Sequence, residues 1–276
     1  MVLFGFGFCV TAFIGYRGLE WLSRFAVPAM IILVAVSMTI ATSDAGGLSG
    51  LLAITPTDEM TMAAAITLVF GTFVSGGTQA TNWTRFAKSG RTAVIATLAA
   101  FFLGNGLMTL IGAFGALVYQ QADIVDIMVA QGLATLGILM LFLNLWTTQD
   151  NTVYNFAVAG CNLIRTRRRK SVTIGGAAIG TVLAVMGMYE WLIPFLVLLG
   201  TFIPPIGGVI MASYFIGYKR QYPDLREVTL PAFNVPGLAA YAIGSAAAYT
   251  SPWIAPIVGV VVAAISYSVI LVINEG

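Results

Sequence analysis

A polar run inside an otherwise apolar stretch holds the side chains best suited to chemistry: Asn144-Leu145-Trp146-Thr147-Thr148-Gln149-Asp150-Asn151. At about 100° per residue, the positions i, i+3, i+4 and i+7 of a helix share one stripe, which here comprises Asn144, Thr147, Thr148 and Asn151. Because such groups are costly in lipid, the stripe should face the protein interior or water, and it favours a route for a substrate or ion. Asp150 has two interpretations, a functional carboxylate or a member of a structural network.

A second run, Val69-Phe70-Gly71-Thr72-Phe73-Val74-Ser75-Gly76-Gly77-Thr78, combines glycines with hydroxyl side chains. Glycine has a poor helix propensity and hydroxyls compete for backbone hydrogen bonds, so this run predicts a break in a helix. In transporters, broken helices offer free N–H and C=O groups to a substrate or ion. The alternative is close packing between helices through small residues.

A third run, Phe202-Ile203-Pro204-Pro205-Ile206-Gly207-Gly208, predicts a kinked helix. Each proline removes a backbone donor, and the glycines permit close approach or a hinge. A kink that serves packing is sufficient to explain the run, and a gate is the functional alternative.

The composition places these runs in a membrane protein. Of the 276 residues, 59% are hydrophobic and 9% charged, too few charges for a water-facing surface. The absence of histidine excludes His-based metal sites, proton relays and catalytic triads, so we expect neither an enzyme nor a bound cofactor. Cys9 and Cys161 lie in or beside apolar stretches and predict no disulfide framework. The net charge of +2 favours no acidic partner or nucleic acid, and no protein partner is evident.

Apolar runs predict an all-α, polytopic transmembrane helical bundle. The expected spans are a partial helix at 1–15 and full spans at 23–43, 62–84, 92–119, 127–163, 172–189, 191–217, 233–250 and 252–273. The polar segment 43–59 is expected to be a loop. The start of the chain lacks the features of a signal peptide and reads as the end of a transmembrane helix.

Charge placement supports this map. Threading the spans alternately through a bilayer puts all 13 basic residues on one side and leaves only acidic charge in the opposite loops. Basic residues mark cytoplasmic loops, so we expect an inner (plasma) membrane protein with cytoplasmic basic loops and C-terminus. The basic run 165–170 is interpreted as a topology anchor with no substrate role.

Four motifs in order, T-F-V-S-G-G, A-F-F-L-G-N-G-L-M (Ala100 to Met108), N-L-W-T-T-Q-D-N and I-P-P-I-G-G-V-I, give the chain a resemblance to bacterial cytosine permeases. These belong to the nucleobase:cation symporter-1 (purine-cytosine permease) family. The resemblance implies a LeuT-like five-plus-five inverted-repeat fold with a truncated first repeat. Within one transporter domain, 1–276, it divides the chain into a remnant of the first repeat (1–43), the second repeat (62–217) and two additional helices (233–273). The chain is therefore expected to be an incomplete copy that does not transport alone.

The resemblance also implies roles for individual residues. Phe73 would stack on the face of a nucleobase, and Asn144 would read its polar edge. The implied substrate-binding set is Thr72, Phe73, Ser75, Gly76, Asn144 and Gln149. Thr147 and Thr148 would supply hydroxyl ligands to a partial sodium site, because hard cations prefer oxygen. The cytosine permeases carry Asn at Gln149 and Ser at Thr72, so cytosine, a related pyrimidine, a thiamine-precursor pyrimidine or a purine all remain candidate substrates.

These features predict import of a nucleobase by cation symport through alternating access, with the base, the cation and the lipid bilayer as partners. The hydroxyl pair Thr147 and Thr148 favours Na⁺ as the coupling cation. Because Asp150 could carry a proton, H⁺ is the alternative. The alternative is a passive channel or facilitator for a small polar solute, in which the polar stripe would line a continuous pore.

Overall fold

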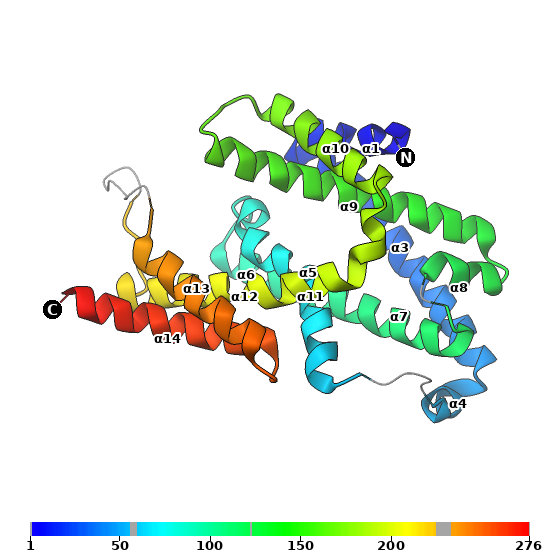
Figure 1. Cartoon of the computed structure of the whole chain (residues 1–276). Helices are drawn as coiled ribbons and strands as arrows, with labels where there is room; N and C mark the ends of the chain where they lie inside the picture. Colours follow the sequence, from blue (N-terminus) through cyan, green and yellow to red (C-terminus); the bar gives the residue numbers. More distant parts are fainter. Residues whose placement is uncertain (1, 56–59, 122, 225–232, 276) are drawn as a thin grey trace. The chain divides into compact units, whose positions relative to one another are not determined.

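A computed structural model describes residues 2–55, 60–121, 123–224 and 233–275, and every regular element within them is a helix. The helices of Figure 1 form two compact units. The first unit comprises Met1–Asp58 and Arg85–Glu190, and the second comprises Glu59–Thr84 and Trp191–Gly276. The predicted repeat boundaries fall elsewhere, because compact units reflect packing and not repeat membership. The repeat assignment stays a prediction.

The first unit is built around the longest helix, α9. Its elements are α1 (Val2–Gly7), α2 (Val10–Ile14), α3 (Tyr16–Asp44), α4 (Gly47–Ala53), α6 (Gly90–Ala99), the π-helical segment η1 (Ala100–Asn105), α7 (Gly106–Tyr119), α8 (Ile124–Ala130), α9 (Ala134–Leu163), α10 (Arg169–Val185) and the short η2 (Met188–Trp191). Helices α2, α3, α8 and α10 all pack on α9.

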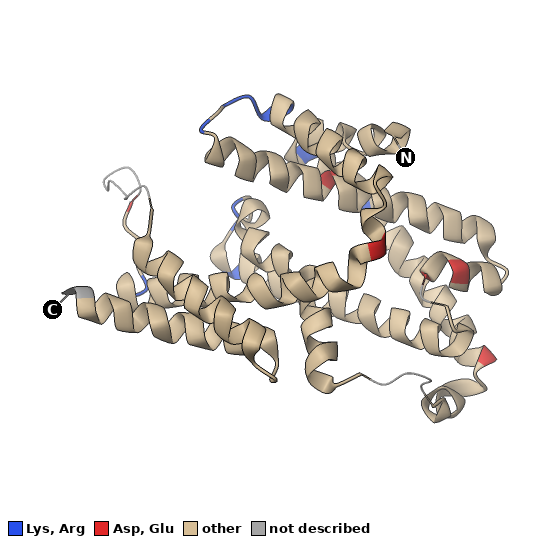
Figure 2. Ribbon diagram, in the orientation of Figure 1, with Lys and Arg blue, Asp and Glu red and all other residues tan. Residues whose placement is uncertain are grey.

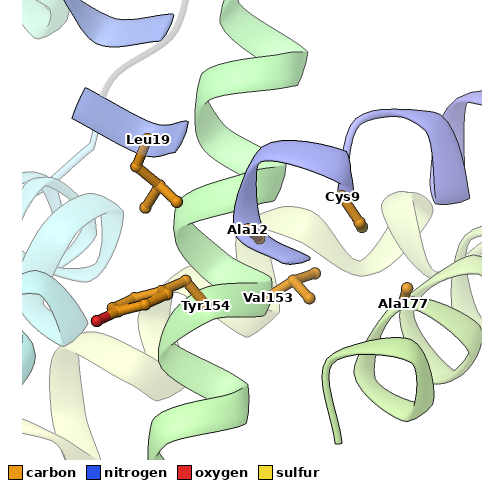
Figure 3. Close-up of a cluster of buried hydrophobic side chains, with 6 residues drawn as sticks. All are labelled: Cys9, Ala12, Leu19, Val153, Tyr154 and Ala177. Carbon is orange, nitrogen blue, oxygen red and sulfur yellow. The ribbon is translucent and has the colours of Figure 1, made fainter. Parts of the chain in front are cut away.

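Two apolar clusters hold α9 in the first unit. One cluster joins α2, α3, α9 and α10 through Cys9, Ala12, Leu19, Val153, Tyr154 and Ala177, as Figure 3 shows. The other cluster joins α3, α8 and the N-terminal half of α9 through Leu33, Val34, Met128 and Met140. Each fully buried aliphatic side chain of this size contributes about 1.5–3 kcal/mol in a water-based reference state, and less where lipid is the alternative environment.

The second unit comprises α5 (Met62–Thr84), α11 (Leu192–Phe202), α12 (Pro204–Ala212), the π-helical η3 (Ser213–Gly217), α13 (Val235–Thr250) and α14 (Ala255–Glu275). Helix α14 packs on α12 and α13, with Ala212, Ala240 and Tyr267 at the core. The predicted kink is confirmed, since α11 ends at Phe202 and α12 begins at Pro204. A Cβ on Gly208 would meet the backbone of Val260 in α14, so this glycine permits close approach.

Among the described residues, five helical segments are long and apolar enough to cross a membrane. They are Tyr16–Asp44, Met62–Thr84, Gly90–Tyr119, Met188–Gly217 and Ala255–Ile273. Helices α10 and α13 are shorter, at 17 and 16 residues. Helix α9 has 30 residues but is not one of the five, because its polar run lowers its hydropathy. The chain is thus a multi-pass, all-helical membrane protein.

Three sequence expectations need correction. The stretch 127–163 is not one helix, because Gly132 adopts a left-handed φ of 76° and separates α8 from α9. The partial helix 1–15 is divided into α1 and α2. The expected loop 43–59 contains α4, and its residues 56–59, with the acidic pair Asp58–Glu59, lie outside the described part of the chain.

Charges separate along α9 within the first unit. In Figure 2 the basic run 165–170 follows the C-terminal end of α9, whereas acidic residues in and next to α8 lie at its N-terminal end. At the acidic end, the Tyr119 hydroxyl donates to Asp44 Oδ2 at 2.5 Å. Basic and acidic residues thus lie at opposite ends of α9 within the first unit. The predicted topology depends on the same separation of basic loops from acidic loops. The topology itself, with Arg226 outside the described residues, stays a prediction.

Candidate functional site

One face of the α9 polar run is tied to α1 and α2. Trp146 Nε1 donates to Thr11 Oγ1 at 3.1 Å, and Thr11 Oγ1 donates to Asp150 Oδ2 at 2.7 Å. Asp150 is only 1% exposed and Thr11 5%. The carboxylate therefore belongs to a buried network between helices, as the structural interpretation of Asp150 expects, and the functional interpretation stays a prediction.

Gln149 and the aromatic residues around Trp146 extend the same face. The Gln149 Nε2 atom donates to the Gly5 carbonyl oxygen in α1 at 2.7 Å. Trp146 lies against Phe8 and Phe142, with ring centroids 6.0 and 5.6 Å away. The amide nitrogen of Gln149 thus serves a contact between helices in this structure, and its predicted substrate role is untested.

Asn144 lies on a different part of α9, at the wall of a cavity. The cavity has a volume of about 1180 Å³ and lies within the first unit, between α3, α4, the segment Ala99–Ile111, Phe114 and α9. Its lining is almost entirely apolar, and Asn144 is its single amide. Within the described part of the chain, no protein group hydrogen-bonds the Asn144 side chain, which is exposed. This amide is free to bind a polar edge of a ligand.

A π-helical segment lines the same cavity. Segment η1 covers Ala100–Asn105, and Ala100, Leu103 and Gly104 face the cavity that Asn144 lines. Single π-helical turns inside α-helices occur frequently at functional sites. Two of the sequence motifs, AFFLGNGLM and NLWTTQDN, therefore meet at one cavity of the first unit. The π-helix was not predicted from the sequence, although Gly104 and Gly106 weaken the helix there.

Thr147 and Thr148 differ in their surroundings. The Thr147 hydroxyl is 8% exposed and donates to the carbonyl oxygens of Leu143 and Asn144, at 2.9 and 3.2 Å. Donation to the backbone leaves the lone pairs of this hydroxyl oxygen available as a cation ligand. Thr148 is exposed, and its side chain has no hydrogen-bond partner among the described residues. Both hydroxyls are compatible with an oxygen site for a hard cation.

The predicted break in α5 is wrong. Helix α5 runs without interruption from Met62 to Thr84, through the whole glycine-rich run. A Cβ on Gly71 would overlap the carbonyl oxygen of Leu196, and a Cβ on Gly200 would overlap that of Thr67. The glycine at position 71 therefore serves close packing of α5 on α11, which was the alternative interpretation.

The predicted α5 site residues lie along this unbroken helix. Thr72 is exposed and its hydroxyl donates to the Val69 carbonyl at 2.6 Å. Phe73 and Ser75 are half-buried. Gly76 is buried against the Phe73 ring, since a Cβ there would lie 2.9 Å from Phe73 Cε1. Gly76 thus gives the aromatic ring room to lie along the helix.

The site residues fall into two groups that belong to different units. Asn144, Thr147, Thr148 and Gln149 are in the first unit, and Thr72, Phe73, Ser75 and Gly76 are in the second. Within the first group the structure separates Asn144, at the cavity, from Gln149, at α1. Among the described residues, no cluster of three His, Cys, Asp or Glu side chains is placed to hold a metal ion. A cation site here would depend on hydroxyl and carbonyl oxygens.

Comparison with known proteins gives consistent results. Residues 1–270 match the model of a family described as permeases for cytosine/purines, uracil, thiamine and allantoin. The chain is 38% identical over 261 residues to cytosine permeases of Escherichia coli K12 and O157:H7, covering 95% of this chain and 62% of each relative. The solved inward-facing conformation of Mhp1 matches with a TM-score of 0.74 at 19% identity, over 99% of this chain and 65% of that one. The fold is that of LeuT-like transporters.

Proposed function

This chain belongs to the family of permeases for cytosine/purines, uracil, thiamine and allantoin, and we propose that it forms part of a secondary active transporter that imports a nucleobase with a cation. The relatives named cytosine permeases make cytosine the first substrate to test. The chain spans 62% of their length, so the activity proposed is that of the whole protein.

The observation that carries the proposal is the unpartnered amide of Asn144 at a largely apolar cavity. A nucleobase has two flat apolar faces and a polar edge with donors and acceptors. An amide supplies both kinds of group, so Asn144 would bind the edge while apolar walls accept the faces. Thr72, Phe73, Ser75 and Gly76 of α5 are also proposed as substrate-binding residues, with Phe73 stacking on a base. Gln149 is proposed to add an acceptor through its carbonyl oxygen.

The coupling cation is proposed to be Na⁺, bound through the hydroxyls of Thr147 and Thr148. The hydroxyl of Thr147 donates to its own helix, so its oxygen can accept a cation without a competing protein donor on that side. Thr148 lies one residue on, with a side chain that makes no other hydrogen bond among the described residues. Asp150 is already bound by Thr11, which favours a hydroxyl site over a carboxylate site for the cation.

Transport would proceed by alternating access. The substrate and the cation would bind together near the middle of the membrane, and each would stabilise an occluded state that opens to either side. The protein would lie in the inner membrane with its basic loops and C-terminus in the cytoplasm, because basic residues are retained on that side.

Uptake of radiolabelled cytosine into proteoliposomes tests this function. The chain would be compared with a chimera that adds to it the part of the Escherichia coli K12 cytosine permease that lies outside the matched region, since the chain covers 62% of that relative. Each protein would be assayed with an inward sodium gradient and with choline in place of sodium, beside a Thr148→Val version of the same protein. Circular dichroism would establish that all four proteins are folded.

We expect the chimera to accumulate cytosine above the external concentration only with the sodium gradient, and the Thr148→Val version to lose that accumulation. Uptake that only equilibrates cytosine, equally with sodium and choline, would replace symport with a passive facilitator. A folded chimera that takes up no nucleobase under either condition would contradict the proposed function.

A further inference from the structure

Basic residues from two distant segments meet at one end of the first unit. Arg85 Nη2 donates to the Tyr154 hydroxyl at 2.9 Å, and the Arg169 guanidinium lies 5.9 Å from the centroid of the same ring. Tyr154 is 3% exposed, so it fixes both arginines on α9. Arg85 and Arg169 therefore lie on the same tyrosine ring, next to the C-terminal part of α9.

The basic run 165–170 comprises the loop after α9 and the first two residues of α10, and several contacts hold it in place. Arg169 donates from Nη1 to the Ala12 carbonyl and from Nη2 to the Phe13 carbonyl, both at 3.2 Å, and so caps the C-terminal end of α2. Lys170 Nζ lies 4.9 Å from the centroid of the Phe13 ring. The backbone N–H of Arg168 donates to Thr166 Oγ1 at 3.3 Å. These contacts hold the loop in place and leave the other three arginines exposed: Arg165, Arg167 and Arg168.

Among the described residues, no acidic side chain forms an ion pair with these three arginines. Within the described part of the chain, the single ion pair joins Arg24 to Glu20 at 2.6 Å. The loop leads directly into α10, which begins at Arg169 and has no acidic residue in its first turn. The free N–H groups of that helix end add further positive potential. Three arginines at a helix N-terminus form a surface suited to a phosphate group, which guanidinium groups bind in a bidentate manner.

Two strongly exposed apolar side chains adjoin the same arginines. Leu163 is 85% exposed and Ile164 63%, at the last turn of α9 immediately before Arg165. A free phosphate would leave both side chains in water, whereas a phospholipid offers acyl chains beside its phosphate. Apolar and basic residues side by side at a helix end are typical of the membrane interface.

We propose that Arg165, Arg167 and Arg168 bind the phosphate of an anionic phospholipid, with Leu163 and Ile164 against its acyl chains. This site does not depend on the proposed transport function, because none of its residues lines the Asn144 cavity or belongs to the α5 run. The basic run is then more than a topology anchor, since it selects the lipid that surrounds this end of the first unit.

Native mass spectrometry of the full chain in detergent micelles tests the proposal, with phosphatidylglycerol and phosphatidylcholine titrated separately. The test variant is Arg167→Gln with Arg168→Gln, and the matched control is Lys219→Gln with Arg220→Gln, which removes the same charge from the second unit. A second variant, Arg167→Lys with Arg168→Lys, keeps the charge. Thermal unfolding followed by circular dichroism would establish that each variant is folded.

Each basic residue near a membrane surface contributes about fivefold to association with anionic lipid. We therefore expect phosphatidylglycerol to bind more tightly than phosphatidylcholine, and the glutamine pair at 167 and 168 to weaken that binding roughly 25-fold. The control pair should keep native affinity, and the lysine pair should keep most of it. Equal retention of both lipids, equal losses in the test and control pairs, or binding of inorganic phosphate that displaces the lipid at millimolar concentration would each overturn the proposal.

Discussion

The glycine-rich run of α5 and the polar run of α9 look alike in the sequence, since both interrupt apolar spans with small or polar residues, but they have different structures. In α5 the helix is continuous, and Gly71 packs against the backbone of α11. In α9 the helix is also continuous, but its polar side chains divide between a buried network with α1 and α2 and the wall of a cavity. Small residues in the first run bring helices together, whereas polar side chains in the second either join helices or remain open to a ligand.

This difference shows that residue type alone does not determine how a polar run is used. A glycine in place of alanine destabilises a helix by about 1 kcal/mol. It also lets the backbone of a neighbouring helix come into contact, and this packing stabilises the pair of helices. The neighbouring helix decides which effect prevails, and α11 supplies that neighbour for α5. In α9 the partners of Trp146, Gln149 and Asp150 join this helix to α1 and α2, and they lie more than 130 positions away in the chain.

The largest expected effect of a single substitution is on the buried α9 network. Thr11→Val removes the donor to Asp150 and the acceptor of Trp146 with little change in shape. Removing one hydrogen bond from the buried Asp150 carboxylate and one from the half-buried Trp146 N–H should lower the free energy of unfolding by about 3 kcal/mol. The matched control is Thr152→Val, because the exposed Thr152 hydroxyl bonds only to its own helix. Thermal or denaturant unfolding in detergent measures both. Equal stability of the two variants would contradict the network.

The packing role of α5 predicts the next largest effect. Gly71→Ala should lower the free energy of unfolding by about 2 kcal/mol, because the new Cβ would overlap the Leu196 carbonyl. Gly207→Ala in α12 is the control, since no atom lies within 4 Å of a Cβ at that position. Alanine is the better helix former, so the control should be neutral or stabilised by up to about 1 kcal/mol. A Gly71→Ala protein as stable as the native protein would contradict the close packing of α5 on α11.

The open face of α9 predicts a change in binding with little change in stability. Asn144→Leu should weaken nucleobase binding about tenfold, because an amide that pairs with the base edge contributes about 1.4 kcal/mol. Its unfolding midpoint should stay close to that of the native protein, since the Asn144 side chain has no protein partner among the described residues. Equilibrium binding of radiolabelled cytosine to the chimera measures the first effect. An unchanged affinity would remove Asn144 from the site.

The smallest effect on stability and binding is expected at Gln149. A substitution there can distinguish the contact with α1 from a contact with the substrate. Gln149→Leu removes the hydrogen bond to the Gly5 carbonyl and should lower the free energy of unfolding by about 1 kcal/mol. If the carbonyl oxygen of Gln149 also contacts the base, the affinity for cytosine should fall as well, though by less than in Asn144→Leu. A loss of stability without any loss of affinity would assign Gln149 to the contact with α1 alone.

Much of the fold could be predicted from apolar periodicity, and the errors have local physical causes. The helices of the bundle and the kink at Pro204 were predictable, because span length and proline act through the sequence nearby. The division between α8 and α9 depends on the backbone of Gly132, whose left-handed φ the apolar pattern does not record. The π-helix at Ala100–Asn105 was missed because this run is almost entirely apolar, so a local change of helical period leaves no contrast between polar and apolar positions.

The candidate site was predictable only in part. The polar stripe predicts Asn144, Thr147 and Thr148 on one side of α9, but it does not predict that Thr147 is buried whereas Asn144 and Thr148 are exposed. Thr11, which holds Asp150, was missed, because a lone threonine in an apolar run gives no signal of its own. The partner of a buried carboxylate is a tertiary feature, and periodicity within one helix cannot identify it.

The most direct test of the central claim, that the open face of α9 binds a nucleobase together with sodium, is the cytosine affinity of the chimera measured in sodium and in choline. The account predicts that sodium tightens cytosine binding, and that Thr148→Val removes this effect while leaving the weaker binding in choline unchanged. Cytosine affinity that is equal in sodium and choline, or a sodium effect that survives in Thr148→Val, would contradict it.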